Sequence, residues 1–153
     1  MQTELLLHHT HLIPEIAELR LREMGYLVPE KKLEDFHKGL EEHLNEKELP
    51  IAFVTTENHK FIGTFSLRKY DMGTHQHFSP WIGGVLVHPD KRKQGIGSFL
   101  VKKAESLAKE MGYHHLYLFT PNKAVWYAKL GWKVTEHTFF NQIPVTIMEK
   151  ELI

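Results

Sequence analysis

The sequence predicts an α/β or α+β fold in which strands and amphipathic helices surround one central β-sheet. Strand-like runs flank the two helical runs of the C-terminal half, which gives a β-α-β arrangement at the centre of the chain. The 153 residues are enough to bury one hydrophobic core but too few for two ordinary domains. We therefore expect a single domain that spans residues 1–153.

The first half of the chain shows two helical patterns between short strands. Apolar residues recur at helical spacing over residues 13–24, and a second amphipathic stripe covers residues 29–44. Residues 3–8 are expected to form a first strand. Residues 50–55 and 60–69 are rich in β-forming residues and are expected to form a hairpin.

The second half contains the clearest helical pattern, over residues 97–111, with one apolar and one charged face. An apolar strand over residues 81–87 precedes it. Gly83 and Gly84 within that strand predict a bulge or a close approach of the backbone to another group. The other expected elements are a strand over residues 113–119, a short helix over residues 122–130, and a closing hairpin of residues 132–140 and 143–150.

Composition limits the classes of function. Apolar residues make up 42% and charged residues 25% of the chain, a balance typical of a soluble globular protein. The 19 Lys and Arg equal the 19 Asp and Glu, so no global field favours nucleic acid or an anionic membrane as a partner. The absence of cysteine excludes disulfides and a cysteine acyl-enzyme. No apolar run approaches the roughly 20 residues of a membrane span, so we expect a cytoplasmic protein.

A candidate anion site lies where the strand over residues 81–87 leads into the long helix. The first turn of a helix has unpaired N–H groups at the positive end of its dipole, and therefore attracts phosphate. Gly95 and Gly97 allow the backbone to come close to such a group. The pattern alone also fits an ordinary helix start. Leu100 replaces the third glycine of a Rossmann site, and the Gly-Lys-Ser/Thr of a P-loop is absent.

Two motifs make the pattern more specific. Residues 92–97 read R-x-x-G-x-G, which resembles the pyrophosphate-binding motif of the Gcn5-related N-acetyltransferase (GNAT) family. Downstream, Asn122 and the sequence YAKLGW, which begins at Tyr127, are similar to that family's Asn followed by Tyr-x-x-x-Gly-aromatic. The resemblance covers nearly the whole chain and is strongest over residues 81–132.

The resemblance implies a mixed central sheet of about seven strands, splayed between the fourth and fifth strands, with about four helices. It implies that acetyl-CoA lies in the split as co-substrate and that no metal takes part. Carried over position by position, it assigns the cofactor contacts to the backbone of Val85, Leu86 and Val87, to the loop and helix start formed by Arg92, Lys93, Gln94, Gly95, Ile96, Gly97 and Ser98, and to Asn122.

Acyl transfer to an amine needs a neutral nucleophile, a stabilised carbonyl oxygen and a tolerable leaving group. The resemblance places Tyr127 beside the coenzyme sulfur as the catalytic residue. Its reference pKa of about 10, against about 8.5 for a thiol, favours hydrogen bonding over full proton donation. A bulge at the paired glycines would free a backbone N–H near Leu86 or Val87 for the carbonyl oxygen. A core aromatic role for Tyr127 is the alternative.

Trp81 stands where several relatives carry a catalytic Glu. We expect it to line the acceptor pocket as a substrate-binding residue, with a core position as the alternative. The proton acceptor is open between ordered water, binding of an already neutral amine, and a side chain at the edge of the cleft. The candidate side chains are Glu57, Asp71, His75, His77 and His115.

The sequence thus predicts an acetyl-CoA-dependent N-acetyltransferase that acts on a primary amine by direct attack in a ternary complex. The amine belongs to a small molecule, a peptide N-terminus or a protein lysine. A non-catalytic acyl-CoA sensor or assembly module of the same fold is the alternative. His8, His9 and His11 have no carboxylate at ligand spacing, so they are expected to be surface histidines rather than a metal site. The acceptor, the acyl chain length and the oligomeric state stay open.

Overall fold

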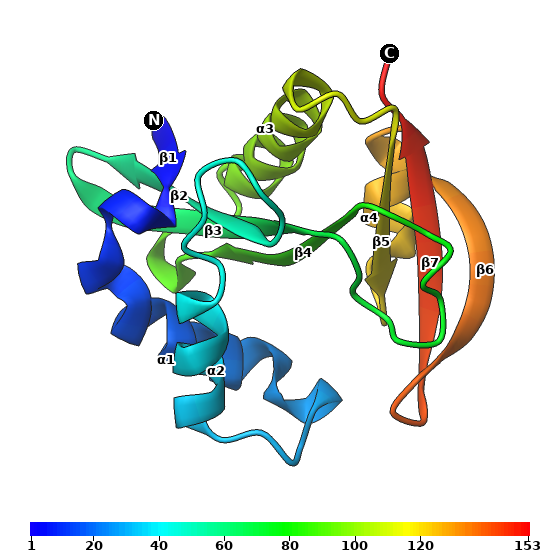
Figure 1. Cartoon of the computed structure of the whole chain (residues 1–153), viewed down its shortest axis with the longest axis horizontal. Coiled ribbons are helices and arrows are strands. Elements are labelled where there is room, and N and C mark those ends of the chain that lie inside the picture. The colour runs from blue at the N-terminus through cyan, green and yellow to red at the C-terminus, as the bar shows by residue number, and fades with distance from the viewer.

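The computed structural model describes residues 1–153 and contains one sheet of seven strands with four α-helices (Figure 1). The strand order is β1-β2-β3-β4-β5-β7-β6. All neighbouring strands are antiparallel except β4 and β5, which are parallel. The predicted mixed sheet is therefore confirmed. None of the helices combines the length and the hydropathy that crossing a membrane requires.

The elements follow the predicted order. The strands are β1 (Gln2–Leu5), β2 (Ile51–Glu57), β3 (Lys60–Arg68), β4 (Trp81–Val87), β5 (His115–Thr120), β6 (Lys133–Phe140) and β7 (Ile143–Glu151). The helices are α1 (Ile13–Met24), α2 (Leu33–Glu41), α3 (Ile96–Glu110) and α4 (Ala124–Lys129).

Two predicted N-terminal elements are longer than the observed ones. The first strand ends at Leu5, and the next residues form a 3₁₀ turn instead of continuing to residue 8. The second helix begins only after Lys32, because the Asp35 carboxylate accepts a hydrogen bond from the Lys32 N–H at 2.8 Å and caps the helix there. The expected span of residues 29–44 is therefore too long for this helix.

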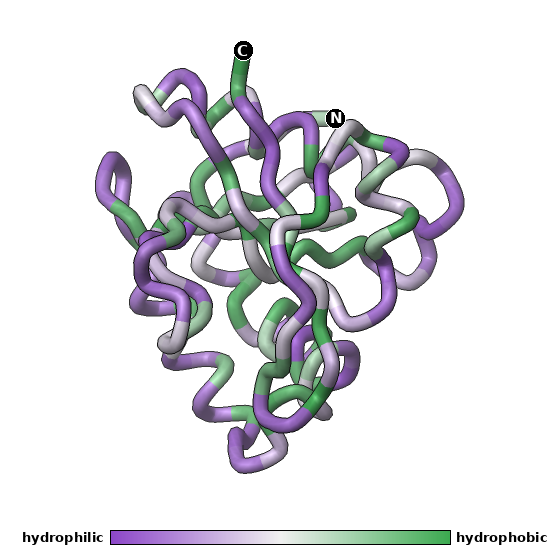
Figure 2. The backbone as a smooth tube through the Cα atoms, turned by 90° about the vertical axis from the view of Figure 1, so that its right-hand side faces the viewer, coloured by the Kyte–Doolittle hydropathy of each residue, from purple (hydrophilic) through white to green (hydrophobic).

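Both faces of the sheet are covered at β2 and β3, so these two strands are buried along most of their length. On β2, Ile51 and Phe53 pack toward α3, whereas Ala52 and Val54 pack toward α1 and α2. This alternation is the two-residue period of a strand buried on both faces. Figure 2 shows hydrophobic backbone segments gathered in the middle of the molecule, while the outer turns are mostly hydrophilic.

The sheet splits between β4 and β5. Only one residue pair, Trp81 with Tyr117, joins the two strands, and they diverge beyond it. The predicted bulge is present in β4, where Thr64 and Ser66 of β3 pair with Leu86 and Gly83. The extra residue turns the following side chains to the other face of the sheet. The fold thus leaves an opening between β4 and β5, and the bulged strand β4 forms one of its walls.

Candidate active site

A cleft of about 1330 Å³ occupies the split between β4 and β5. Side chains and backbone from α1, α2, β4, the start of α3, the end of β5 and α4 line it. The residues singled out from the sequence that line it are Val85, Leu86, Val87, Arg92, Lys93, Gly95, Ile96, Gly97, Ser98, Asn122 and Tyr127. Gln94 is exposed outside the cleft, and Trp81 does not border it.

The edge of β4 that faces β5 is free along the cleft. Because the two strands pair only at Trp81, the backbone from Ile82 onward has no strand partner on that side. A free strand edge can pair with an extended polar chain as an added strand would. Val85, Leu86 and Val87 lie on this part of β4, where the resemblance places the pantetheine arm.

The N-terminus of α3 lies at the end of this edge and is open. Gly95 occupies the N-cap position in the left-handed conformation, with φ of 79°, which glycine adopts without strain. No side chain caps the first turn and no acidic residue lies in it. The N–H groups of Ile96, Gly97 and Ser98 therefore have neither an intrahelical acceptor nor a competing carboxylate. Such a terminus favours an anion.

Arg92 ties this loop to the other side of the cleft. Its guanidinium bonds the Glu23 carboxylate on α1 at 2.5 Å, and its Nε donates to the Val87 carbonyl at 3.4 Å. Part of its charge is therefore already compensated. Lys93, which adopts a positive φ of 62°, is left without a carboxylate partner and supplies positive charge at the cleft.

Tyr127 lies on α4 with its ring packed edge-on against Trp126 and Trp132. The residue is buried, with 9% of its surface exposed, yet it borders the cleft, and its hydroxyl makes no hydrogen bond within the protein. Burial raises the pKa of Tyr127 to about 12. The hydroxyl therefore keeps its proton at neutral pH and has a hydrogen bond to donate. Asn122 also borders the cleft, with its side chain unpaired.

Trp81 lies in the core. Its side chain is fully buried, and its indole N–H donates to the Phe78 carbonyl at 2.6 Å. It packs with Met72, Val145 and Ile147 on the face of the sheet that the loop before β4 covers. The expected place on the wall of the acceptor pocket is thus not where the structure puts it. The alternative interpretation, a core tryptophan, fits the observed packing.

Among the side chains considered as proton acceptors, only Asp71 borders the cleft. His75 bonds Glu136 at 2.9 Å, His77 packs against the Phe78 ring, and Glu57 lies 3.9 Å from the Lys91 ammonium. His115 is exposed at the start of β5.

The histidines near the N-terminus form one pair with a carboxylate and no larger cluster. His9 bonds Glu4 at 3.1 Å, and its ring lies 5.9 Å from that of His11. No group of three or more His, Asp or Glu side chains in the chain is arranged to hold a metal ion.

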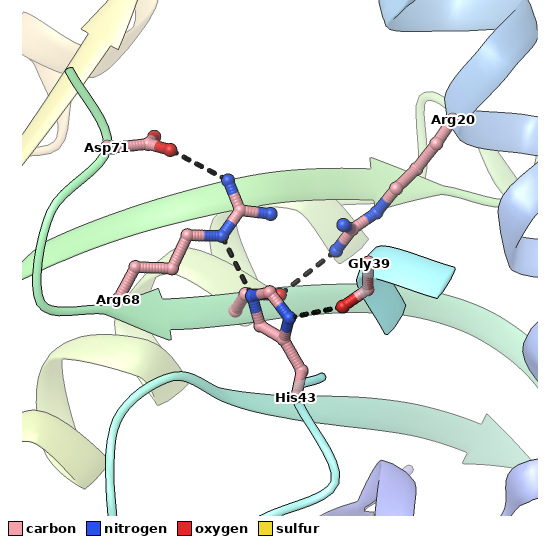
Figure 3. Close-up of polar contacts among 6 residues, drawn as sticks. Arg20, Gly39, His43, Arg68 and Asp71 are labelled. Atoms are coloured by element: carbon pink, nitrogen blue, oxygen red, sulfur yellow. Dashed lines mark hydrogen bonds and ion pairs between the residues drawn. The ribbon is translucent and has the colours of Figure 1, made fainter. Parts of the chain in front are cut away.

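A polar cluster at the β4 bulge was not predicted from the sequence. It consists of Arg20 on α1, His43 after α2, Arg68 at the end of β3 and Asp71 in the following loop, all of which border the cleft (Figure 3). Arg68 donates to Asp71 at 2.8 Å and, through Nε, to His43 at 3.0 Å. His43 Nδ1 donates to the Gly39 carbonyl at 2.7 Å.

His43 is neutral in this cluster. Burial and the neighbouring Arg68 lower its pKa to about 4. Arg20 has its pKa lowered to about 9, chiefly by burial and then by Arg68. A sequence signal for Arg20 existed, because it falls on the apolar stripe of α1, four residues after Ile16. The other members come from separate elements, and nothing in the sequence brings them together.

Comparison with known proteins agrees with this geometry. The Acetyltransferase (GNAT) family profile matches residues 13–132. No curated protein sequence matches the chain.

Three solved structures illustrate the similarity. An aminoglycoside 6'-N-acetyltransferase complexed with coenzyme A has a TM-score of 0.78 and 18% identity, over 100% of this chain and 98% of that one. A ribosomal-protein-alanine N-acetyltransferase from Brucella melitensis has a TM-score of 0.75 and 18% identity, over 99% of this chain and 100% of that one. The putative acetyltransferase yncA from Salmonella typhimurium, with its cofactor acetyl-CoA, has a TM-score of 0.72 and 17% identity, over 99% of this chain and 94% of that one.

At these identities the structural likeness speaks for the fold alone. The profile match, however, extends over most of the chain and includes α1, the bulged strand, the open N-terminus of α3 and Tyr127. The chain therefore belongs to the GNAT family of acetyltransferases.

Proposed function

We propose that this protein transfers an acetyl group from acetyl-CoA to a primary amine by direct attack in a ternary complex. The observation that carries the proposal is the continuity of two features along one wall of the cleft. The unpaired edge of β4 leads to the uncapped N-terminus of α3. A ligand with an extended amide-bearing arm and a pyrophosphate matches this pair of features, and coenzyme A is such a ligand.

In this proposal different segments of the cleft bind different parts of coenzyme A. The backbone of Val85 to Val87 pairs with the pantetheine arm. The N–H groups of Ile96, Gly97 and Ser98 hold the pyrophosphate, with Arg92, Lys93 and the Gly95 turn beside it. Asn122, which borders the cleft after β5, bonds the arm from the other wall in this proposal. Gln94, which is exposed outside the cleft, has no part in it.

The chemical step needs little covalent help from the protein. The neutral amine nitrogen attacks the thioester carbon, and the C–S bond breaks. The amine gives its proton to water in the cleft, and the coenzyme leaves as a thiolate that takes up a proton from water. Tyr127 donates a hydrogen bond to the departing sulfur and stabilises its negative charge. Its raised pKa means that it acts as a hydrogen-bond donor and keeps its proton through most of the step. In this proposal the bulge in β4 frees a backbone N–H near Leu86 or Val87, which stabilises the negative charge on the thioester carbonyl oxygen.

The experiment is a thiol-release assay with acetyl-CoA and a panel of primary amines, with acetylated products identified by mass spectrometry. At least one amine should stimulate release and appear as its N-acetyl product. Two of the three neighbours are named for different acceptors, an aminoglycoside and a ribosomal-protein alanine, so the panel should be broad. If the protein binds acetyl-CoA but no amine is acetylated, the non-catalytic acyl-CoA module is the correct interpretation.

A further inference from the structure

The polar cluster at the β4 bulge contains a buried positive charge that the protein does not neutralise. Arg20 is only 6% exposed, and its one hydrogen bond goes to the Ser66 hydroxyl at 2.9 Å. Its Nε is one of two buried side-chain polar atoms in the chain that have no partner. No carboxylate lies within ion-pair distance of Arg20, although a guanidinium carries several donors. A buried charge without a partner is unfavourable.

The strand beside this arginine is shaped to admit it. A Cβ at Gly84 would lie 2.4 Å from Arg20 Nη2, and one at Gly83 would lie 2.8 Å from Arg68 Nη1. The two glycines thus allow both guanidiniums to approach the bulge, where the proposed reacting carbonyl lies. In Figure 3 the two guanidinium groups reach toward each other from α1 and β3.

The charges in the cluster do not balance. Arg20 and Arg68 are both positive, Asp71 is the one carboxylate, and His43 is neutral because of its lowered pKa. One positive charge of the cluster is left without a carboxylate. The coenzyme pyrophosphate does not neutralise this charge, because its proposed site lies elsewhere. That site, the start of α3 with Lys93, follows the C-terminal end of β4, whereas the bulge lies in the middle of the strand.

We propose that this cluster binds a carboxylate of the acceptor, and that the acceptor is a small amine that carries a carboxylate, an amino acid. The inference rests on the proposed acetyl transfer. Guanidinium groups bind carboxylates through paired, charge-assisted hydrogen bonds, and Arg20 has free donors for them.

Asp71 complements this site for the other end of the acceptor. Its Oδ1 accepts from Arg68, whereas its Oδ2 makes no hydrogen bond within the protein. That oxygen would lie 2.9 Å from a Cβ at Gly83, so it too is close to the bulge. An amine or ammonium group beside it would be oriented toward the thioester. The cluster therefore offers Arg20 to the carboxylate and Asp71 to the amino group of a zwitterion.

The test compares the standard L-amino acids with their α-amides as acceptors, by thiol release. The wild type should acetylate at least one amino acid with kcat/KM at least about tenfold above that of its amide, a difference of about 1.4 kcal/mol. Arg20→Met should bring this ratio close to one. Arg22→Met, which changes an exposed arginine of the same helix outside the cleft, should keep the ratio.

Three results would overturn the inference while leaving acetyl transfer intact. They are acid and amide acetylated equally by the wild type, acetylation only of amines without a carboxylate, or an acid-to-amide ratio that Arg20→Met leaves unchanged. The last would mean that Arg20 does not contact the acceptor carboxylate.

If no amine is acetylated, the proposed function fails separately, and the carboxylate site is then judged by binding. Saturation-transfer NMR on the CoA-saturated protein should detect an amino acid on the wild type and lose it with Arg20→Met. Absence of binding to the wild type would refute the site.

Discussion

The tight contact between Gly84 and Arg20 gives a prediction with a magnitude set by the structure. Gly84 has φ of 60°, and alanine in that region costs about 1–2 kcal/mol. The added Cβ would also lie 2.4 Å from Arg20 Nη2 and 2.8 Å from Arg20 Cζ. The buried guanidinium must then move and give up its hydrogen bond to Ser66, which costs about 1.5–3 kcal/mol more.

Gly84→Ala should therefore lower the free energy of unfolding by about 2.5–5 kcal/mol, or Tm by roughly 10 °C. Urea unfolding measures the first and a thermal melt the second. Gly73→Ala is the matched control, since a Cβ there meets nothing within 4 Å, and it should change stability by less than about 0.5 kcal/mol.

A double-mutant cycle with Arg20→Ala separates the two causes. In the Arg20→Ala background the collision is gone, so Gly84→Ala should cost only the backbone part of about 1–2 kcal/mol. Equal costs in the two backgrounds would show that the guanidinium does not fill the space beside the bulge. A total cost under about 1 kcal/mol would refute both parts of the reasoning.

The remaining predictions concern two buried side chains and the partly buried His43. Tyr127→Phe should lower kcat about 10- to 1000-fold while leaving acetyl-CoA affinity and Tm nearly unchanged, and an unaltered kcat in stopped-flow or steady-state assays would remove its role. Trp81→Ala should lower the free energy of unfolding by about 3–5 kcal/mol in urea titrations without raising the acceptor KM, and a raised KM with intact stability would return it to the pocket. His43 has a folded-state pKa of about 4, below its unfolded value of 6.5, so the unfolded chain binds the extra proton between them. The contribution of neutral His43 to the free energy of unfolding is at most about 3 kcal/mol. It is fully present above pH 6.5 and is lost as the pH falls toward 4. Urea titrations from pH 7 to pH 4.5 should show a shallower loss for His43→Gln than for the wild type, and parallel curves would contradict this.

Much of the fold follows from local patterns in the chain. The periodicity of α1 and α3 and the paired glycines of β4 predict two helices and a bulge that the structure confirms. The predicted extent of α2 is wrong because one capping carboxylate, Asp35, sets its start more strongly than the apolar stripe. A side-chain cap acts through a single hydrogen bond and leaves little trace in a periodicity.

The site could be predicted only where one short segment forms it. The loop and helix start that include Gly95 and Gly97 line the cleft as expected, since their geometry depends on neighbours in sequence. The position of Trp81 was not predictable, because the face of the sheet that a strand residue occupies depends on what covers that face. The polar cluster joins distant segments: Arg20 bonds a serine 46 positions further along the chain, and Arg68 bonds a histidine 25 positions before it. Only the folded chain brings these residues together.

The most direct test of the central claim is calorimetric titration of acetyl-CoA into the wild type, Gly97→Asp and Ser106→Asp. Both variants place the same negative charge on α3, the first at its open N-terminus in the cleft and the second on its exposed face. Acetyl-CoA should bind the wild type and Ser106→Asp alike, and Gly97→Asp more weakly by well over about tenfold, or about 1.4 kcal/mol. Unchanged affinity in a Gly97→Asp variant that keeps its circular dichroism spectrum, or no binding to the wild type, would contradict the account.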